Sequence, residues 1–225
     1  MSDRDDARPF DGVIFDCDGT LVDSELLNAQ GVADLFAHDH GIELDAAAIE
    51  AEFRGGRFET MIDTLAARHG VRVADDFTPR YRAYMIELFG QALQPMPGVH
   101  AAIEALAERG LSLCVASSGP EKKLAAALAA TELAGYFGEA VFSAYPLGVW
   151  KPEPDLFLHA ADAIGVAPER CAVIEDSDAG VEAARRAGMR VFGYDPHGAI
   201  GAHPRAALTR FSDYRRLPDL LTAGP

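Results

Sequence analysis

The sequence predicts an α/β protein whose core is a doubly wound (Rossmann-like) parallel sheet, with an all-helical cap domain inserted into that core. From residue 98 onward, short apolar runs rich in β-branched residues alternate with helical patterns, as is typical of a parallel sheet covered on both faces. An earlier apolar run, residues 13–15, precedes a long segment of helical patterns without a convincing strand. We therefore assign the first strand to the sheet and place the helical insertion directly after it.

The expected elements follow from the apolar spacing. The strands are expected at residues 13–15, 111–116, 140–142, 171–174 and 190–193. The insertion has helical spacing over residues 26–40, 46–53, 61–70 and 79–93, and the core over residues 99–110, 121–130, 157–165, 180–187 and 217–221. The prediction is a core domain of residues 1–23 and 94–225 and a cap domain of residues 24–93. Linkers at 23–24 and 93–97 would act as a paired hinge.

Composition and charge narrow the classes of function. The 225 residues carry a formal net charge of −15, which argues against partners such as nucleic acid or anionic membranes. No apolar stretch is long enough to span a bilayer, and the acidic N-terminus lacks the apolar region of a signal peptide. Cys17, Cys114 and Cys171 lie in or beside apolar runs, as expected for buried cysteines in a reducing, cytoplasmic compartment. Nothing in the sequence demands more than a monomer.

The strongest chemical signal follows the first strand. Asp16 and Asp18 come directly after residues 13–15, and Gly19 allows a sharp turn. Alternate residues of an extended segment point the same way, so both carboxylates can face one small volume at the carboxyl end of a strand. Two like charges so close require a cation or a shared proton, and Mg²⁺ suits such oxygen ligands. The alternative is a turn that uses Asp and Gly for their conformational preferences.

Three later segments carry polar residues suited to phosphate or metal binding. Ser117 and Ser118 follow a strand, where a hydroxyl and backbone N–H groups can hold phosphate oxygens; an ordinary serine N-cap is the alternative. Lys151 is one of three lysines against seventeen arginines, and its compact charge suits a phosphoryl group; a solvated lysine before a turn is the alternative. Glu175 and Asp176 follow another strand and could complete an oxygen shell for Mg²⁺, or favour a helix N-terminus through its dipole.

Taken in order, these segments resemble the motifs of the haloacid dehalogenase-like (HAD) superfamily. The matching motifs are DxDGT at residues 16–20, a serine after the second core strand, lysine before proline at residues 151–152, and EDS at residues 175–177. The longer run DxDGTLVDSE resembles the β-phosphoglucomutase-like phosphatases. Residues 117–120, 150–152 and 195–198 are most similar to 6-phosphogluconate phosphatase-type members.

The resemblance implies catalytic roles for both aspartates. By position, Asp16 would be the nucleophile that forms an aspartyl-phosphate, and Asp18 would be the general acid/base. Mg²⁺ would bind the carboxylate of Asp16, the backbone carbonyl of Asp18 and the carboxylate of Asp176. Glu175 would be a further ligand, directly or through water. Some family members carry an acid at the position of Gly180, and its absence gives Glu175 more weight.

The resemblance also implies where the substrate binds. Ser117, Ser118 and Lys151 would hold the phosphoryl oxygens. Arg54 and Gly55 occupy a position that resembles a substrate-facing loop in related caps, where an arginine could meet a carboxylate or a second phosphate. Exposed arginines at a helix break are the alternative for this loop.

The function expected from these residues is a Mg²⁺-dependent phosphatase acting on a small phosphorylated metabolite, a sugar phosphate. Dehalogenases of the superfamily lack the second aspartate, so Asp18 favours phosphoryl transfer to or from oxygen. A phosphomutase using the same aspartyl-phosphate is the alternative, although the sugar-phosphate mutases of this group carry a histidine where this chain has Asn28. A non-catalytic phosphate-binding regulator would not need both Asp16 and Asp18.

Overall fold

Six short segments form one parallel sheet at the centre of the core. The computed structural model describes residues 9–54, 56–203 and 208–222. In sheet order the strands are β3 (Val141–Ser143), β2 (Ser112–Ser117), β1 (Gly12–Phe15), β4 (Cys171–Glu175), β5 (Arg190–Tyr194) and β6 (Leu208–Phe211). Every neighbouring pair is parallel. This is the order of a doubly wound sheet, in which ligands bind where the strand order reverses, here between β1 and β4.

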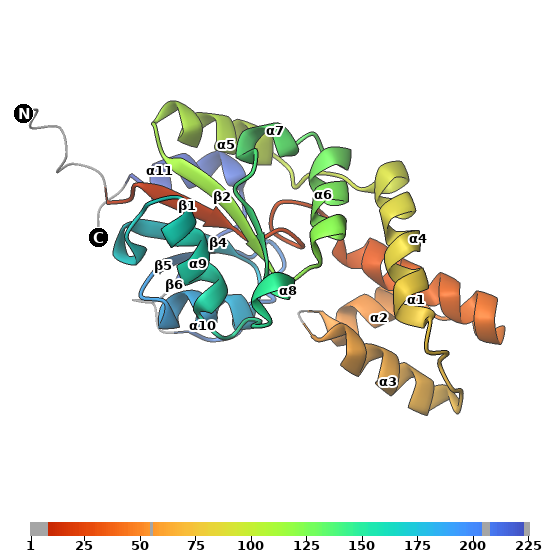
Figure 1. The fold of residues 1–225 in the computed structure, drawn as a ribbon. Coiled ribbons are helices and arrows are strands. Elements are labelled where there is room, and N and C mark those ends of the chain that lie inside the picture. Colours follow the sequence, from red (N-terminus) through yellow and green to blue (C-terminus); the bar gives the residue numbers. More distant parts are fainter. Residues whose placement is uncertain (1–8, 55, 204–207, 223–225) are drawn as a thin grey trace, which may run out of the picture.

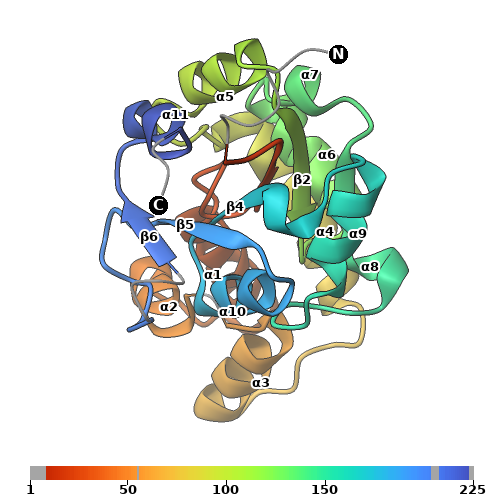
Figure 2. The ribbon, with the colours of Figure 1, turned by 90° about the vertical axis from the view of Figure 1, so that its left-hand side faces the viewer.

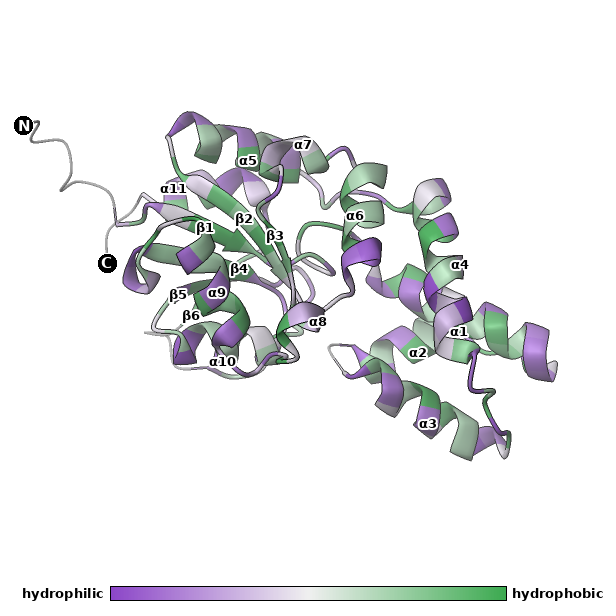
Figure 3. Ribbon diagram, in the orientation of Figure 1, coloured by the Kyte–Doolittle hydropathy of each residue, from purple (hydrophilic) through white to green (hydrophobic). Residues whose placement is uncertain are grey.

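Helices cover both faces of the sheet, which confirms the predicted fold class (Figures 1 and 2). Val13 and Phe15 of β1 belong to one apolar cluster, and Ile14 belongs to another on the opposite face. Because both of their faces are buried, the central strands β1 and β4 are apolar along most of their length instead of alternating with polar residues (Figure 3). The core helices are α5 (Val99–Glu108), α6 (Glu121–Ala130), α7 (Ala134–Phe137), α8 (Ala144–Leu147), α9 (Asp155–Ala163), α10 (Asp178–Arg186) and α11 (Leu217–Leu220).

Four helices lie between β1 and α5 in the chain and form a lobe beside the core (Figure 1). They are α1 (Glu25–His40), α2 (Ala46–Phe53), α3 (Phe58–His69) and α4 (Phe77–Ala92). We call them the helical insertion. Phe36 of α1 and Phe77 of α4 pack edge to face at 5.7 Å inside it. Of the helices that the structure describes, each falls short, in length or in apolar content, of what a membrane crossing requires.

The two connections between the core and the insertion run side by side. The backbone N–H of Asp23 donates to the carbonyl of Gln94 at 2.9 Å, and the N–H of Met96 donates to the carbonyl of Leu21 at 2.9 Å. Val22 and Pro95 form an antiparallel bridge between these contacts. A paired connection of this kind fits the expected hinge, and the division into domains at residues 23–24 and 93–94 stays a prediction.

The structure adds elements that the apolar spacing did not predict. β6 has only two apolar residues, Leu208 and Phe211, and lies at the edge of the sheet, so its sequence carries little strand signal. Helices α7 and α8 are single turns of four residues, too short for helical periodicity to be visible. α3 begins at Phe58 and α4 at Phe77, each a few residues earlier than the apolar spacing indicated.

The segment after β6 supports the loop that follows the first strand. Tyr214, in the 3₁₀ helix η2 (Tyr214–Arg216), is fully buried and packs edge to face against Phe211. Its hydroxyl donates a hydrogen bond to the backbone carbonyl of Thr20 at 2.7 Å. Thr20 lies two residues after Asp18, so this bond fixes the turn that carries the second aspartate.

We predict that Tyr214→Phe lowers the free energy of unfolding by about 1–3 kcal/mol, because the buried carbonyl of Thr20 loses its donor. The measurement is urea unfolding followed by far-UV circular dichroism. Tyr84→Phe is the matched control: its hydroxyl bonds Asp34 at 2.7 Å in a partly exposed position of the insertion, where water can replace it. Its expected loss is below about 1 kcal/mol. Equal losses in the two variants would contradict a special role for Tyr214.

Candidate active site

A buried lysine joins the carboxyl ends of β1 and β4. Asp16 follows β1, and its backbone N–H donates to the carbonyl of Ile174 at 2.9 Å, which fixes it beside β4. The ammonium group of Lys151 forms an ion pair with Asp16 and donates to Oε1 of Glu175 at 2.6 Å. Only 5% of the Lys151 side chain and 1% of the Glu175 side chain are exposed. One cation therefore compensates two buried acids that lie far apart in the sequence.

The charge at Asp16 is only partly balanced. Burial raises the pKa of Asp16 to about 7, and the neighbouring carboxylates of Glu175 and Asp18 add to the rise, although Lys151 opposes it. The carboxyl group is thus held in a position where its ionised form needs more positive charge than the described side chains supply.

Glu175 is held on its other side by the start of α10. Its Oε2 accepts hydrogen bonds from the backbone N–H groups of Asp176 and Ser177, at 2.9 and 2.8 Å, and from the hydroxyl of Ser177 at 2.9 Å. Its carboxylate also fills the space beside Gly180, where an added Cβ would lie 1.8 Å from Oε1. With Glu175 in this place, glycine is the residue that fits at position 180.

Asp176 is a partly buried acid that has no ion-pair partner among the described residues. Thr20 donates to its Oδ1 at 3.0 Å, and none of the described Lys, Arg or His side chains forms an ion pair with it. Burial raises its pKa well above the usual range, with further contributions from Glu175 and Asp16. Its Oδ2 would lie 2.2 Å from a Cβ at position 19, and Gly19 has φ of +73°, so glycine is required there on both counts.

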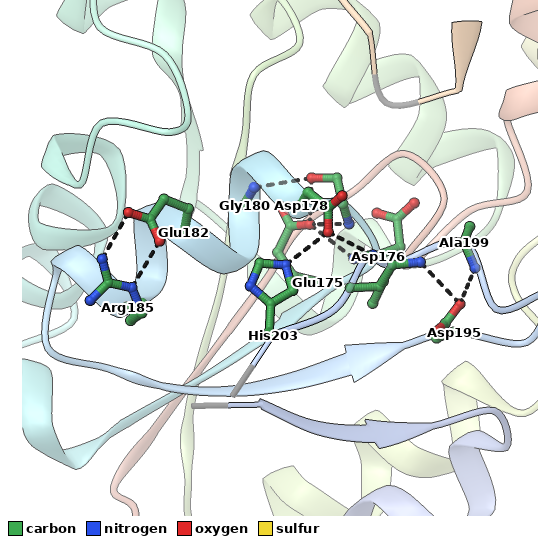
Figure 4. Close-up of polar contacts among 12 residues, drawn as sticks. Glu175, Asp176, Asp178, Gly180, Glu182, Arg185, Asp195, Ala199 and His203 are labelled. Atoms are coloured by element: carbon green, nitrogen blue, oxygen red, sulfur yellow. Dashed lines mark hydrogen bonds and ion pairs between the residues drawn. The ribbon is translucent and has the colours of Figure 1, made fainter. Parts of the chain in front are cut away.

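Asp178, the next acid along the chain, does not line the cavity of the site. Asp178 accepts hydrogen bonds from the backbone N–H of Gly201 and from the ring of His203, both at 2.8 Å (Figure 4). In the same view, Asp195 accepts a bond from the N–H of Ala199 at 2.6 Å. Asp178 therefore links the loop after β5 to the start of α10.

The donor set fits a magnesium ion. Asp16 and Asp176 are two under-compensated carboxylates in contact with the same cavity, and the carbonyl of Asp18 is a further oxygen from the same turn. Among the described residues, no three His, Cys, Asp or Glu side chains form a ready cage for a metal. Mg²⁺ differs from metals that need such a cage, because it is commonly bound by one or two carboxylates, water and substrate phosphate.

Asp18 has a cationic partner that the sequence interpretation missed. Lys123, in the first turns of α6, donates to both carboxylate oxygens of Asp18 at 2.8 Å, and Ser24 donates to Oδ1 at 2.5 Å. Burial alone would raise the pKa of Asp18, but Lys123 and these hydrogen bonds outweigh it, so the pKa is lowered. Lysine is rare in this sequence, and the rarity that pointed to Lys151 applied equally to Lys123. It also applied to Lys122, and only the structure shows that Lys123, not Lys122, contacts Asp18.

The serines lie at the end of β2 as predicted. Ser117 is buried, and its Oγ accepts a hydrogen bond from the backbone N–H of Gly119 at 3.1 Å. The hydroxyl of Ser143, at the end of β3, donates to the carbonyl of Gly119 at 2.7 Å and fixes this loop. Ser118 lines the cavity beside Asp16 and Lys151.

A cavity of about 1020 Å³ lies between the core and the helical insertion. From the core it is lined by the predicted residues Asp16, Asp18, Ser117, Ser118, Lys151, Glu175 and Asp176, together with Lys123. The insertion contributes Glu25, Asn28, Glu50, Arg54 and Arg82. The structure thus brings all the predicted core residues to one cavity. Arg54 lines it but forms an ion pair with Glu50 one turn earlier in the chain, and the predicted Gly55 lies outside the described residues.

Known families and proteins resemble this chain over most of its length. The family model of haloacid dehalogenase-like hydrolases matches residues 10–188. The chain is 36% identical over 216 residues to 6-phosphogluconate phosphatase of Escherichia coli (strain K12), covering 95% of each protein. It is 32% identical over 179 residues to hexitol phosphatase B of the same strain, covering 79% of this chain and 80% of that protein.

A solved structure supports the same assignment. A HAD family hydrolase from Deinococcus radiodurans R1, crystallised with bound phosphate and sodium, matches with a TM-score of 0.73 at 31% identity, covering 93% of this chain and 94% of that one. The family match over most of the chain, together with the phosphatases among its relatives, shows that this chain belongs to the haloacid dehalogenase-like hydrolases and is one of their phosphomonoesterases.

Proposed function

We propose that the protein is a Mg²⁺-dependent phosphatase of small sugar phosphates that works through an aspartyl-phosphate on Asp16. The observation that carries the proposal is the meeting of two aspartates, two lysines and the β2 serines at one cavity, since Asp16, Asp18, Lys123, Lys151 and Ser117 all line it. Relatives that the chain matches are named for phosphatase activity on 6-phosphogluconate and on hexitol phosphates, which supports this substrate class.

In the first half of the reaction, a carboxylate oxygen of Asp16 attacks the phosphorus atom in line with the leaving oxygen. The new bond joins Asp16 to phosphorus, and the bond from phosphorus to the sugar oxygen breaks. Asp18 gives that oxygen a proton, which it takes up as the anionic substrate binds beside it, because Lys123 keeps Asp18 ionised in the free site. Lys151, with Ser117 and Ser118, holds the phosphoryl oxygens while charge spreads over them. Asp16 and Asp176 would hold a magnesium ion, which would supply further positive charge to the phosphoryl group.

In the second half, water replaces the sugar. Asp18, now ionised, takes a proton from the water as the water oxygen attacks phosphorus, and the bond between phosphorus and Asp16 breaks to release inorganic phosphate. Lys123 and Ser24 hold the Asp18 carboxylate in the ionised form that this half requires. Both oxygens of Glu175 accept hydrogen bonds, so Glu175 holds Lys151 directly and would reach a magnesium ion only through water.

The helical insertion serves as the cap in this proposal. It contributes one wall of the cavity, and its two connections to the core are hydrogen bonded to each other. Rotation about these connections would open the cavity for substrate and close it against water. Three free, buried cysteines suit a reducing compartment, so we place the enzyme in the cytoplasm, as a monomer whose partner is the small phosphorylated substrate.

We predict that purified protein releases phosphate from a hexitol phosphate with Mg²⁺ and loses this activity when the metal is chelated. Asp16→Asn is expected to reduce turnover to the background rate while far-UV circular dichroism stays unchanged, because the amide cannot act as the nucleophile. Asp63→Asn, an exposed site on α3, is the control and keeps full activity. Substantial turnover by Asp16→Asn would exclude the aspartyl-phosphate, and conversion of hexose 1-phosphates to 6-phosphates would favour a mutase.

A second prediction separates the two halves of the reaction. Asp18→Asn should lower steady-state turnover by about a hundredfold or more, the usual scale for loss of a general acid/base. With p-nitrophenyl phosphate the leaving group needs little protonation, so we expect a burst of about one nitrophenol per enzyme followed by slow hydrolysis. Quenched-flow absorbance measures the burst. Normal steady-state rates in this variant would remove Asp18 from the mechanism.

A third prediction tests the placement of Glu175. Gly180→Ala would push Glu175 away from Lys151, so the free energy of unfolding should fall by about 1–3 kcal/mol, as for overpacked cores. Phosphate release should fall with it. Gly90→Ala, in another helix but with nothing within 4 Å of the added Cβ, should instead raise stability by up to about 1 kcal/mol. Urea unfolding compares the two. A stabilised Gly180→Ala would show that Glu175 does not need that space.

A further inference from the structure

The cations that line the cavity differ in what balances them. Lys151 faces Asp16 and Glu175, and Lys123 faces Asp18. In the insertion, the guanidinium of Arg54 pairs with Glu50, and that of Arg57 lies 4.0 Å from Glu59. The remaining lining cation, Arg82, forms no ion pair with any acid in the described ranges.

Arg82 is nevertheless held in place. It projects from α4 of the insertion, and its Nη2 donates a hydrogen bond at 2.6 Å to the hydroxyl of Tyr145, which belongs to α8 of the core. The guanidinium carbon also lies 5.1 Å from the centre of the Tyr145 ring. Tyr145 in turn packs edge to face against Trp150 at 5.6 Å. A guanidinium fixed by a neutral phenol keeps its full charge and its other N–H donors, for which the described residues supply no partner.

The position of this pair relates it to the reaction centre. Trp150 immediately precedes Lys151, whose ammonium group contacts Asp16. Arg82, Tyr145 and Trp150 line the same cavity as the two aspartates. A substrate whose phosphoryl group lies at Asp16 therefore occupies a cavity whose lining also includes Arg82.

We propose that Arg82, positioned by Tyr145, binds a second anionic group of the substrate, a carboxylate or a second phosphate at the end remote from the scissile phosphate. The fixed guanidinium offers parallel N–H donors that match such a group in two-point contact. Because Tyr145 holds one arm beforehand, little side-chain freedom is lost on binding. This selectivity rests on the proposed phosphatase function, and it moves the anion-binding role expected at Arg54 to Arg82.

The test compares substrates that differ only at the remote end. 6-Phosphogluconate ends in a carboxylate, sorbitol 6-phosphate has the same open six-carbon chain ending in a hydroxyl, and a hexitol 1,6-bisphosphate ends in phosphate. We expect kcat/KM for at least one of the two substrates with an anionic remote end to exceed that for sorbitol 6-phosphate by roughly tenfold to hundredfold, the scale of a hydrogen bond to a charged group. Which substrate is preferred identifies the carboxylate or the phosphate as the group bound.

Variants then assign the preference to Arg82. Arg82→Gln should remove it by raising KM for the preferred substrate roughly tenfold or more, with kcat and the rate on sorbitol 6-phosphate little changed. Arg82→Lys should restore part of it, since charge returns without the fork of donors. Tyr145→Phe should weaken it by a smaller factor. Arg68→Gln, on α3 and paired with Glu52 outside the cavity lining, is the matched control and should behave as the unaltered enzyme.

Each outcome has a distinct meaning. No turnover of any of the three substrates would overturn the proposed phosphatase function and this inference together. Turnover without a preference for an anionic end would overturn the inference alone. If Arg82→Gln lowered kcat/KM equally for all three substrates, the contact with Tyr145 would only hold the insertion against the core. That result would also overturn the inference.

Discussion

The ion pair of Lys151 with Asp16 and Glu175 is the interaction on which the site depends. Removing one member of such a buried group leaves a charge without compensation, which costs far more than the pair contributes. Parallel pairing of β1 with β4 brings the two acids together, and the loop before α9 supplies the lysine. The sheet order therefore places two buried carboxylates side by side. Lys151 lies between them and offsets the electrostatic cost of burying both charges.

Cations also make contacts between the core and the insertion at the wall of the cavity. Lys123 reaches Asp18 from α6 and lies 5.6 Å from the ring of Phe89 in α4. Arg82 of α4 reaches Tyr145 of the core. Two contacts between the core and the insertion thus involve Lys123 and Arg82, cations that also line the cavity. Opening of the insertion would change the surroundings of Asp18 and of Arg82 in a single movement.

Much of this arrangement could be predicted from the sequence, for a physical reason. Asp16, Ser117 and Asp176 follow apolar runs, and parallel strands must end at one edge, so their meeting needed no coordinates. Lys123 and Arg82 lie on helices, where the facing direction depends on packing that periodicity does not reveal. The pairing of Arg54 with Glu50 was visible as a spacing of four residues, and it compensates the charge of Arg54, while the substrate role expected of Arg54 and Gly55 stays a prediction. β6 gave no signal because half of its residues are polar.

The acidic character of the protein follows from the same balance. Because the protein has a formal net charge of −15, it repels a phosphate ester at long range. Attraction for the ester must therefore come from groups inside the cavity. There, Lys151, Lys123 and Arg54 are already matched by acids. Attraction for an anionic substrate is therefore expected to be strongest where positive charge is least matched, at the proposed magnesium ion beside Asp16 and Asp176 and at Arg82. Two separated centres of uncompensated positive charge favour a substrate with two separated anionic groups, so the charge that looks unsuited to phosphate chemistry becomes a source of selectivity.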